Sequence, residues 1–123
     1  LQFGERLQVV INAYPRENLF AMYVPLDSHD TERFKTLVGS NLEKVKLGFQ
    51  FQMAFPGAPA IYYGDEIGLE GGKDPDNRRA FPWQEASWNQ ELRYWIKSLI
   101  ALRKRSSALR RGDFKQQETD KER

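Results

Sequence analysis

Apolar side chains recur along much of the chain with the three- and four-residue spacing of an amphipathic helix. The first such stretch covers residues 1–15. The second begins after Ser40, which has capping-box spacing to the glutamate three residues later, and it ends before Pro56 because proline lacks an amide donor. The third follows another capping-box pair, headed by Ser87, and ends at Gly112. The pattern therefore predicts three helices.

The chain is long enough to form one domain with a single hydrophobic core. The candidates for that core are the apolar residues of the second and third predicted helices. They are Leu42, Val45, Leu47, Phe49, Phe51, Met53 and Phe55, followed by Leu92, Trp95, Ile96, Leu99 and Leu102.

Two short apolar runs, residues 19–24 and 60–63, lie between these helices and are rich in aromatic and β-favouring side chains. Both are continuous rather than alternating, which is typical of strands covered on both faces in a parallel sheet. Helices and strands then alternate along the chain, so the sequence predicts an α/β fold with parallel strands and right-handed crossovers. Residues 68–89 form a long loop with three glycines and two prolines, and its aromatic residues favour an ordered conformation.

Composition narrows the class of protein. Of the 123 residues, 40% are hydrophobic and 29% charged, and no apolar run approaches the ~18 residues that span a bilayer, so we expect no membrane span. The absence of cysteine and the presence of a single histidine exclude disulfides, thiolate metal sites, cysteine nucleophiles and histidine-rich metal cages. Any metal chemistry would have to use carboxylates, and we expect no cofactor and no metal ligands.

The net charge of +2 combines two opposite halves. Residues 1–90 hold 12 acidic and 9 basic side chains, whereas residues 91–123 hold 5 acidic and 10 basic. The basic clusters at 103–105 and 110–111 fall at a predicted helix end, where cations complement the last carbonyl groups. No aromatic platform or recognition motif accompanies them, so we expect no nucleic-acid partner. The polar residues from 115 to 123 are expected to form a frayed tail.

Candidate chemistry lies after the two predicted strands, because ligands of parallel α/β sheets bind beyond the carboxyl ends of the strands. Asp27, His29 and Asp30 follow the first strand, and Asp65 and Glu66 follow the second. Each has a structural alternative: Asp27 can cap a turn, Asp65 and Glu66 can accept from loop amides, and the histidine can serve as a hydrogen-bond partner. Spacing alone leaves both interpretations open.

Four segments resemble the α-amylase family of glycoside hydrolases, especially its neopullulanases, cyclomaltodextrinases and maltogenic amylases. These segments are Leu26–Phe34, Ala54–Gly68, Asp74–Arg79 and Phe81–Trp83. The motifs are long, ordered and correctly spaced, and the resemblance covers residues 1–114. It implies the last quarter of a (β/α)8 barrel, since the first motif ends the family's seventh strand and the second ends its eighth. A whole barrel needs about 250 residues, and the chain does not begin with methionine, so we expect a C-terminal fragment of the catalytic domain.

The resemblance implies a retaining hydrolase of α-linked glucans and maltooligosaccharides. The family's nucleophile and general acid lie on its fourth and fifth strands, which precede this stretch, so the isolated chain is expected to be inactive. Asp30 matches the family's third invariant carboxylate, which binds two hydroxyls of the glucose being cleaved, and His29 matches the partner that binds the same sugar. Asp74 and Arg78 match a pair that binds a more distant glucose, although they can also simply hold their loop.

Two other interpretations of the function remain open. The chain can be a noncatalytic, carbohydrate-binding relative, and a self-contained acid pair such as Asp30 with Glu66 would be the mechanism if the strand assignment failed. The aromatic rings at 83 and 88 can stack on a sugar, although we expect them to pack the loop. Pro25 departs from the family pattern and removes a ladder donor. Two strands without their barrel neighbours expose edges and apolar faces, so we expect self-association.

Overall fold

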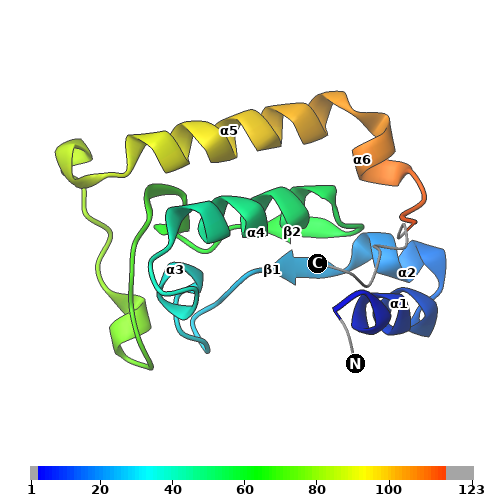
Figure 1. Ribbon diagram of the computed structural model, residues 1–123, viewed down its shortest axis with the longest axis horizontal. Helices are drawn as coiled ribbons and strands as arrows, with labels where there is room; N and C mark the ends of the chain where they lie inside the picture. The colour runs from blue at the N-terminus through cyan, green and yellow to red at the C-terminus, as the bar shows by residue number, and fades with distance from the viewer. Residues whose placement is uncertain (1–2, 116–123) are drawn as a thin grey trace, which may run out of the picture.

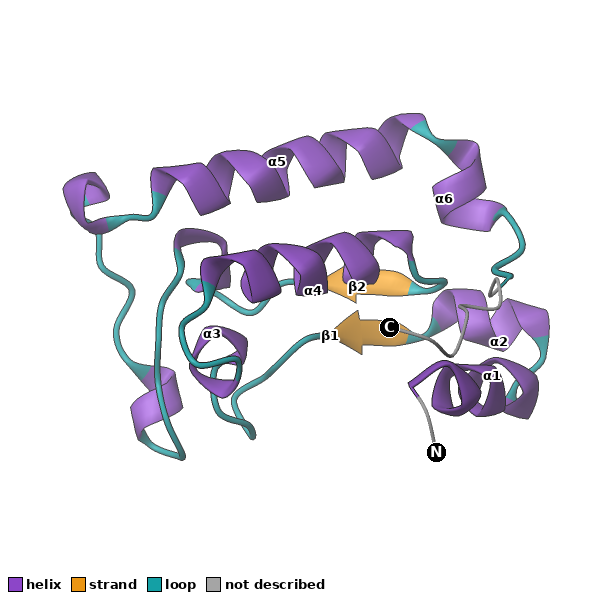
Figure 2. Cartoon of the chain, in the orientation of Figure 1, coloured by secondary structure: helices purple, strands orange, loops and turns teal. Residues whose placement is uncertain are grey.

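The computed structural model describes residues 3–115, and its elements are shown in Figures 1 and 2. In chain order they are α1 (Phe3–Ala13), α2 (Arg16–Ala21), β1 (Tyr23–Pro25), α3 (Phe34–Leu37), α4 (Leu42–Ala54), β2 (Ala58–Ala60), α5 (Gln90–Arg105) and α6 (Ser107–Arg111). Three 3-10 turns, η1 (Asp65–Ile67), η2 (Asp76–Arg78) and η3 (Glu85–Ser87), lie between β2 and α5.

The two strands pair in parallel, with Val24 opposite Pro59, which confirms the predicted parallel connection. Gln52, on the crossover helix α4, is buried beside both strands. Its Nε2 group donates to the carbonyl oxygens of Val24 and Ala60, each at 2.8 Å. Because α4 links β1 to β2, this one side chain ties the helix to both strands, and their carboxyl ends point the same way (Figure 2).

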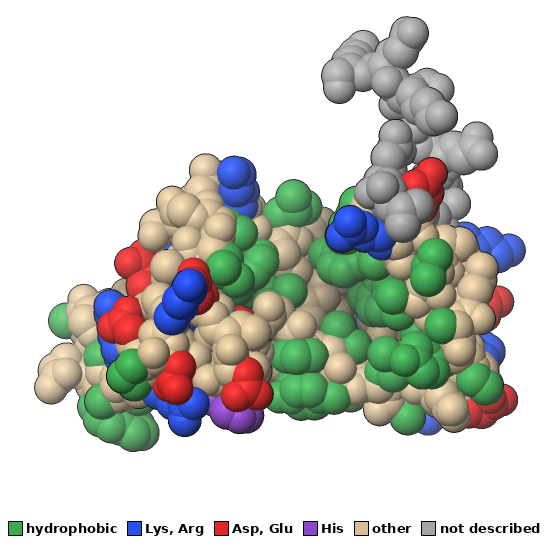
Figure 3. All heavy atoms as spheres, turned by 90° about the horizontal axis from the view of Figure 1, so that it is seen from below, with side chains coloured by type: hydrophobic (Ala, Val, Ile, Leu, Met, Phe, Trp, Pro, Cys, Tyr) green, Lys and Arg blue, Asp and Glu red, His purple; other side chains and the backbone are tan. Residues whose placement is uncertain are grey.

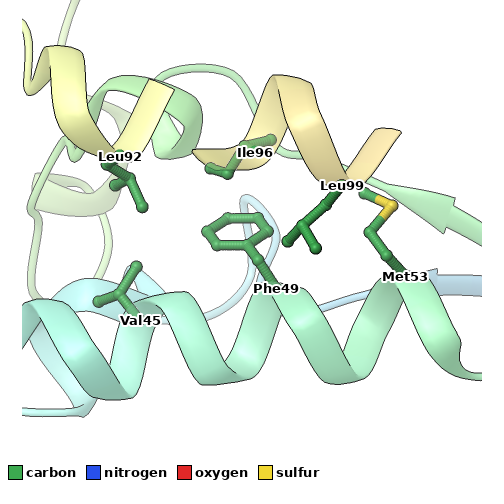
Figure 4. Close-up of a cluster of buried hydrophobic side chains, with 6 residues drawn as sticks. All are labelled: Val45, Phe49, Met53, Leu92, Ile96 and Leu99. Atoms are coloured by element: carbon green, nitrogen blue, oxygen red, sulfur yellow. The ribbon is translucent and has the colours of Figure 1, made fainter. Parts of the chain in front are cut away.

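The core lies between α4 and α5, which run alongside each other in Figure 1. Figure 4 shows its six side chains pointing toward one another from the two helices. They are Val45, Phe49, Met53, Leu92, Ile96 and Leu99, all of them predicted core positions. Phe55 is also buried, but Leu47 and Leu102 are exposed, so the predicted apolar faces were too wide.

The first predicted strand is wrong over half its length, because residues 19–21 belong to α2. Pro15 precedes this helix with φ −54°, and its carbonyl accepts from the Leu19 amide, so a new helix begins at Arg16, two residues after α1 ends. The second strand is shifted to Ala58–Ala60, since Tyr62 and Tyr63 leave the ladder and lie against a guanidinium group.

Helix starts also differ from the capping-box prediction. Asn41 caps α4 by accepting from the Lys44 amide, and Asn89 caps α5 in the same way, whereas Ser40 has a positive φ of 57°. The predicted third helix divides at Ser106, whose hydroxyl accepts from the backbone of the next turn and starts α6. Short α3 has no apolar periodicity, and the sequence pattern missed it.

Arg103 corrects the interpretation of the basic cluster. Its side chain is buried, and its guanidinium donates to the carbonyl oxygens of Met53 and Leu109 at 2.7 Å and of Gly57 at 2.6 Å. Burial lowers the pKa of this group. Arg103 therefore joins the end of α4, the start of the β2 segment and α6, and it is not a solvated cation at the end of its own helix.

Trp83 and Trp88 behave differently in the long loop. Trp88 packs edge-on against Phe81 at 5.7 Å, and its indole NH donates to the Pro82 carbonyl at 2.6 Å. Trp83 contacts Phe81 at 4.9 Å but is 80% exposed. The prediction that the rings pack the loop is confirmed for Trp88, whereas Trp83 contacts the loop through Phe81 and leaves most of its surface exposed. The predicted tail lies outside the described residues except for Lys115.

Candidate functional site

His29 and Asp30 lie together in a turn beyond the carboxyl end of β1. The Nε2 atom of His29 is 3.3 Å from Oδ1 of Asp30, and the two side chains are 62% and 74% exposed. The turn is closed locally, since the Ser28 amide donates to Oγ1 of Thr31 at 3.0 Å. In Figure 3 the chain's one histidine lies at the surface among acidic and basic side chains. Imidazole and carboxylate groups exposed side by side can bind vicinal hydroxyls.

Asp74 and Arg78 form a second exposed pair. Asp74 precedes η2, and Arg78 is its last residue. The Nε atom of Arg78 is 2.9 Å from Oδ1 of Asp74, and both side chains are about half exposed. The two side chains therefore do pair with each other, as the alternative that they hold their own loop requires. The other nitrogens of the guanidinium fork and the second carboxylate oxygen remain capable of further hydrogen bonds.

Beneath these exposed groups lies a buried polar cluster that consists of Asp27, Arg33, Asp65 and Asn77. Arg33 has no exposed surface, and its Nη1 atom donates to Oδ1 of Asp65 at 3.0 Å and to the Tyr63 carbonyl at 2.6 Å. Its guanidinium also lies over the rings of Tyr62 and Tyr63, at 4.0 and 4.5 Å from their centroids. A buried cation with these partners holds the ends of the two strands in a fixed relation.

Two buried acids belong to this cluster, and Arg33 is paired with one of them, Asp65. Oδ2 of the other, Asp27, accepts from the Phe34 amide at 2.6 Å, which confirms that Asp27 caps a turn. Burial and the neighbouring Asp27 raise the pKa of Asp65 to about 9, against the opposing effect of Arg33. The Asp65 carboxyl therefore keeps its proton at neutral pH.

Sequence reasoning missed Arg33 and Asn77 as members of this region. Both residues lie inside the quoted motifs, so the motifs contained them. Nothing in the spacing shows, however, that Arg33 and Asn77, which are 44 residues apart, bond to each other in the fold. Glu66 was predicted to be a structural acceptor, and this is confirmed: its Oε2 accepts from the Gly64 amide at 2.9 Å. Glu66 is thereby engaged with its own turn.

Between residues 3 and 115, no three side chains among the histidine, aspartate and glutamate residues gather as a metal site would require. Nor does any helix over the same residues combine the length and apolar character needed to cross a bilayer.

The carboxyl-edge geometry and the motifs that build it match a known catalytic domain. The family model described as alpha amylase, catalytic domain, matches residues 2–92. The chain belongs to the α-amylase family. This confirms the resemblance inferred from the sequence, and the matched region contains all four residues of the two exposed pairs.

Individual relatives within the α-amylase family are similar over most of the chain. A cyclomaltodextrinase from Geobacillus thermopakistaniensis is 49% identical over 112 residues, which are 91% of this chain and 19% of that enzyme. Neopullulanase 2 from Thermoactinomyces vulgaris is 46% identical over 109 residues, 89% of this chain and 19% of the relative. The chain thus spans about a fifth of the length of these enzymes.

Solved structures of the α-amylase family agree with the fold. A cyclic α-maltosyl-(1→6)-maltose hydrolase from Arthrobacter globiformis superposes with a TM-score of 0.85 at 39% identity, covering 87% of this chain and 24% of the hydrolase. A debranching enzyme from Nostoc punctiforme gives 0.83 at 46% identity, covering 89% of this chain and 22% of the enzyme. These neighbours belong to the (β/α)8-barrel hydrolases.

Proposed function

We propose that this chain is the last quarter of an α-amylase-type barrel and that it holds the glucose at the point where an α-glucan is cleaved. In this proposal β1 and β2 are the seventh and eighth barrel strands. The observation that carries it is the exposed His29–Asp30 pair beyond the carboxyl end of parallel strands, inside a segment that matches the catalytic-domain model. The attacking carboxylate and the general acid then belong to strands outside these 123 residues.

The geometry supports a role in stabilising the transition state. In a retaining hydrolase, positive charge builds on the sugar ring as the leaving oxygen is protonated. The carboxylate of Asp30 accepts hydrogen bonds from the ring hydroxyls and attracts that charge, while His29 binds a hydroxyl of the same glucose. Both contacts strengthen as the ring distorts, so they lower the activation barrier more than they favour substrate binding.

Asp74 and Arg78 bind a glucose further from the cleavage point in this proposal. A carboxylate acceptor beside a guanidinium donor suits two adjacent hydroxyls, and the exposure of both side chains leaves them open to a ligand. The substrate class is an α-linked glucan or maltooligosaccharide, which is supported by relatives named cyclomaltodextrinase and neopullulanase.

The test uses a complete enzyme. The stretch of this chain that aligns with the Geobacillus cyclomaltodextrinase replaces the matching 112 residues of that enzyme, and this chimera is assayed on maltooligosaccharides. We expect His29→Ala to lower kcat about 100-fold with a smaller change in KM, because the lost contact is strongest in the transition state. An unchanged kcat would contradict the proposal and would favour a noncatalytic binding role.

A further inference from the structure

One buried side chain joins the turn of the first exposed pair to the loop of the second. Asn77 immediately precedes Arg78 on η2 and has no exposed surface. Its Nδ2 group donates to the carbonyl oxygens of His29 and Thr31, both at 2.8 Å. These carbonyls flank Asp30, so a single amide group holds the backbone that carries both members of the His29–Asp30 pair.

Arg33 holds the same loop from the other side of the turn. Its Nε atom donates to the Asn77 carbonyl at 2.8 Å, and its backbone amide donates to the Gly71 carbonyl at 2.9 Å. Thr36 then accepts from the Gly71 amide at 3.0 Å through its hydroxyl. The segment after the turn and the loop before η2 are therefore joined at several points, with Arg33 and Asn77 wholly buried.

The remaining bonds of the turn are local. Apart from the two bonds from Asn77, those described at Ser28, Asp30 and Thr31 stay within residues 28–31. A short exposed turn with only local bonds has many accessible conformations. The amide group of Asn77 removes that freedom, and it is the adjacent residue, Arg78, that contributes to the outer pair.

We propose that Asn77 is a positioning residue that makes the His29–Asp30 and Asp74–Arg78 pairs one rigid glucan-binding surface. This inference rests on the proposed function of those pairs. A glucose held by Asp74 and Arg78 fixes η2, and through Asn77 it fixes the turn that contacts the reacting sugar. Binding energy from the outer glucose is thus used to orient groups at the cleavage point.

The direct test is Asn77→Asp in the chimera. Aspartate has the same shape but loses both amide donors, so the turn is released without a cavity. We expect kcat on maltooligosaccharides to fall about 10- to 100-fold while KM changes less, as for a small displacement of a positioned group. Asn12→Asp makes the same chemical change at an exposed residue on α1 and is expected to leave kcat unchanged. A kcat for Asn77→Asp within twofold of the parent overturns the inference.

A second measurement avoids any change in the buried cluster. His29→Ala and Asp74→Ala alter exposed side chains, and their effects on kcat/KM are compared singly and together. Because the outer glucose fixes the turn through Asn77, Asp74→Ala already removes part of the contribution of His29. The double variant is therefore expected to lose at least threefold less than the product of the two single losses. Independent effects overturn the inference while leaving the proposed function intact, whereas a His29→Ala variant with unchanged kcat contradicts the proposed function itself.

Discussion

The buried polar cluster contains two acids and a single arginine. Arg33 is paired with Asp65, yet burial and the neighbouring Asp27 raise the pKa of Asp65 to about 9, so Asp65 keeps a proton at neutral pH. The exposed pairs carry the proposed binding chemistry, but this cluster gives them their support. Residues that do not contact the sugar therefore contribute both to the stability of the fold and to the support of the proposed binding groups.

The proton on Asp65 predicts the pH dependence of stability. Native Asp65, with a pKa of about 9, keeps a proton that the unfolded chain loses above pH 3.8, so the free energy of unfolding contributed by this group falls as pH rises from about 4 to about 9. Asp65→Asn removes that titration and should flatten the slope by about 1 kcal/mol per pH unit at most.

Urea unfolding of the 123-residue chain at pH 5, 7 and 9 measures this slope. Glu17→Gln removes an exposed carboxylate on α2 and serves as the control, with a slope like that of the unchanged chain. Equal slopes for Asp65→Asn and the unchanged chain would show that Asp65 does not hold a proton over this range.

At the scale of elements, the long helices were predictable and the short segments were not. The faces of α4 and α5 repeat apolar residues over several turns, so their burial follows from periodicity. The apolar run at 19–24 is too short to show whether its period is that of a helix or of a strand. Its first half belongs to α2, the helix that begins after Pro15, where the sequence predicted a loop. The ends of β2 and α5 depend on Arg33 and Arg103, which bond to the carbonyl groups of residues as far away in sequence as Tyr63 and Met53, 30 and 50 residues from them.

The residues of the candidate site were predictable from the sequence, but the linkage between them was not. Motifs identified His29, Asp30, Asp74 and Arg78, because these residues carry recognisable chemistry in a fixed order. The linkage through Asn77 was not predictable, since it depends on a loop returning to a turn 46 to 48 residues earlier. Sequence patterns predict the apolar faces and the capping residues of helices, but they do not predict which buried carbonyl group a distant side-chain amide will contact.

Arg103 gives a prediction for the packing of elements. Arg103→Met keeps an apolar stem of similar length but leaves the carbonyl groups of Met53, Gly57 and Leu109 without their donor. We expect a loss of about 3 kcal/mol in the free energy of unfolding, because buried acceptors lose their bonds. Arg105→Met, at an exposed position on the same helix, is expected to cost less than about 0.5 kcal/mol. Equal losses in urea unfolding would contradict the assigned role.

On the scale of the whole molecule, several large apolar side chains of the described residues are exposed. Phe3 is 66% exposed, Tyr23 69% and Leu47 65%, and the sheet formed by residues 3–115 has two strands, each with an open edge. Such surfaces attract other surfaces of the same kind. In the proposed barrel they face neighbouring strands and helices.

The isolated chain is therefore expected to self-associate and not to cleave glucans. Light scattering over a range of concentrations should show an average mass above 14.4 kDa that rises with concentration. A chromogenic maltoside should release no chromophore, because the attacking carboxylate and the acid are proposed to lie elsewhere. A monodisperse monomer would contradict the first expectation, and enzymatic release would revive the Asp30–Glu66 pair as a mechanism.

The most direct measurement of the central claim is the kcat of the chimera with Asp30→Asn, beside Glu17→Gln as a control of the same chemical kind. Loss of the negative charge that faces the developing cation should lower kcat at least about 100-fold, while the control stays within twofold. If Asp30→Asn retains the kcat of the parent chimera, these residues do not stabilise the cleavage of an α-glucan, and the proposed function is wrong.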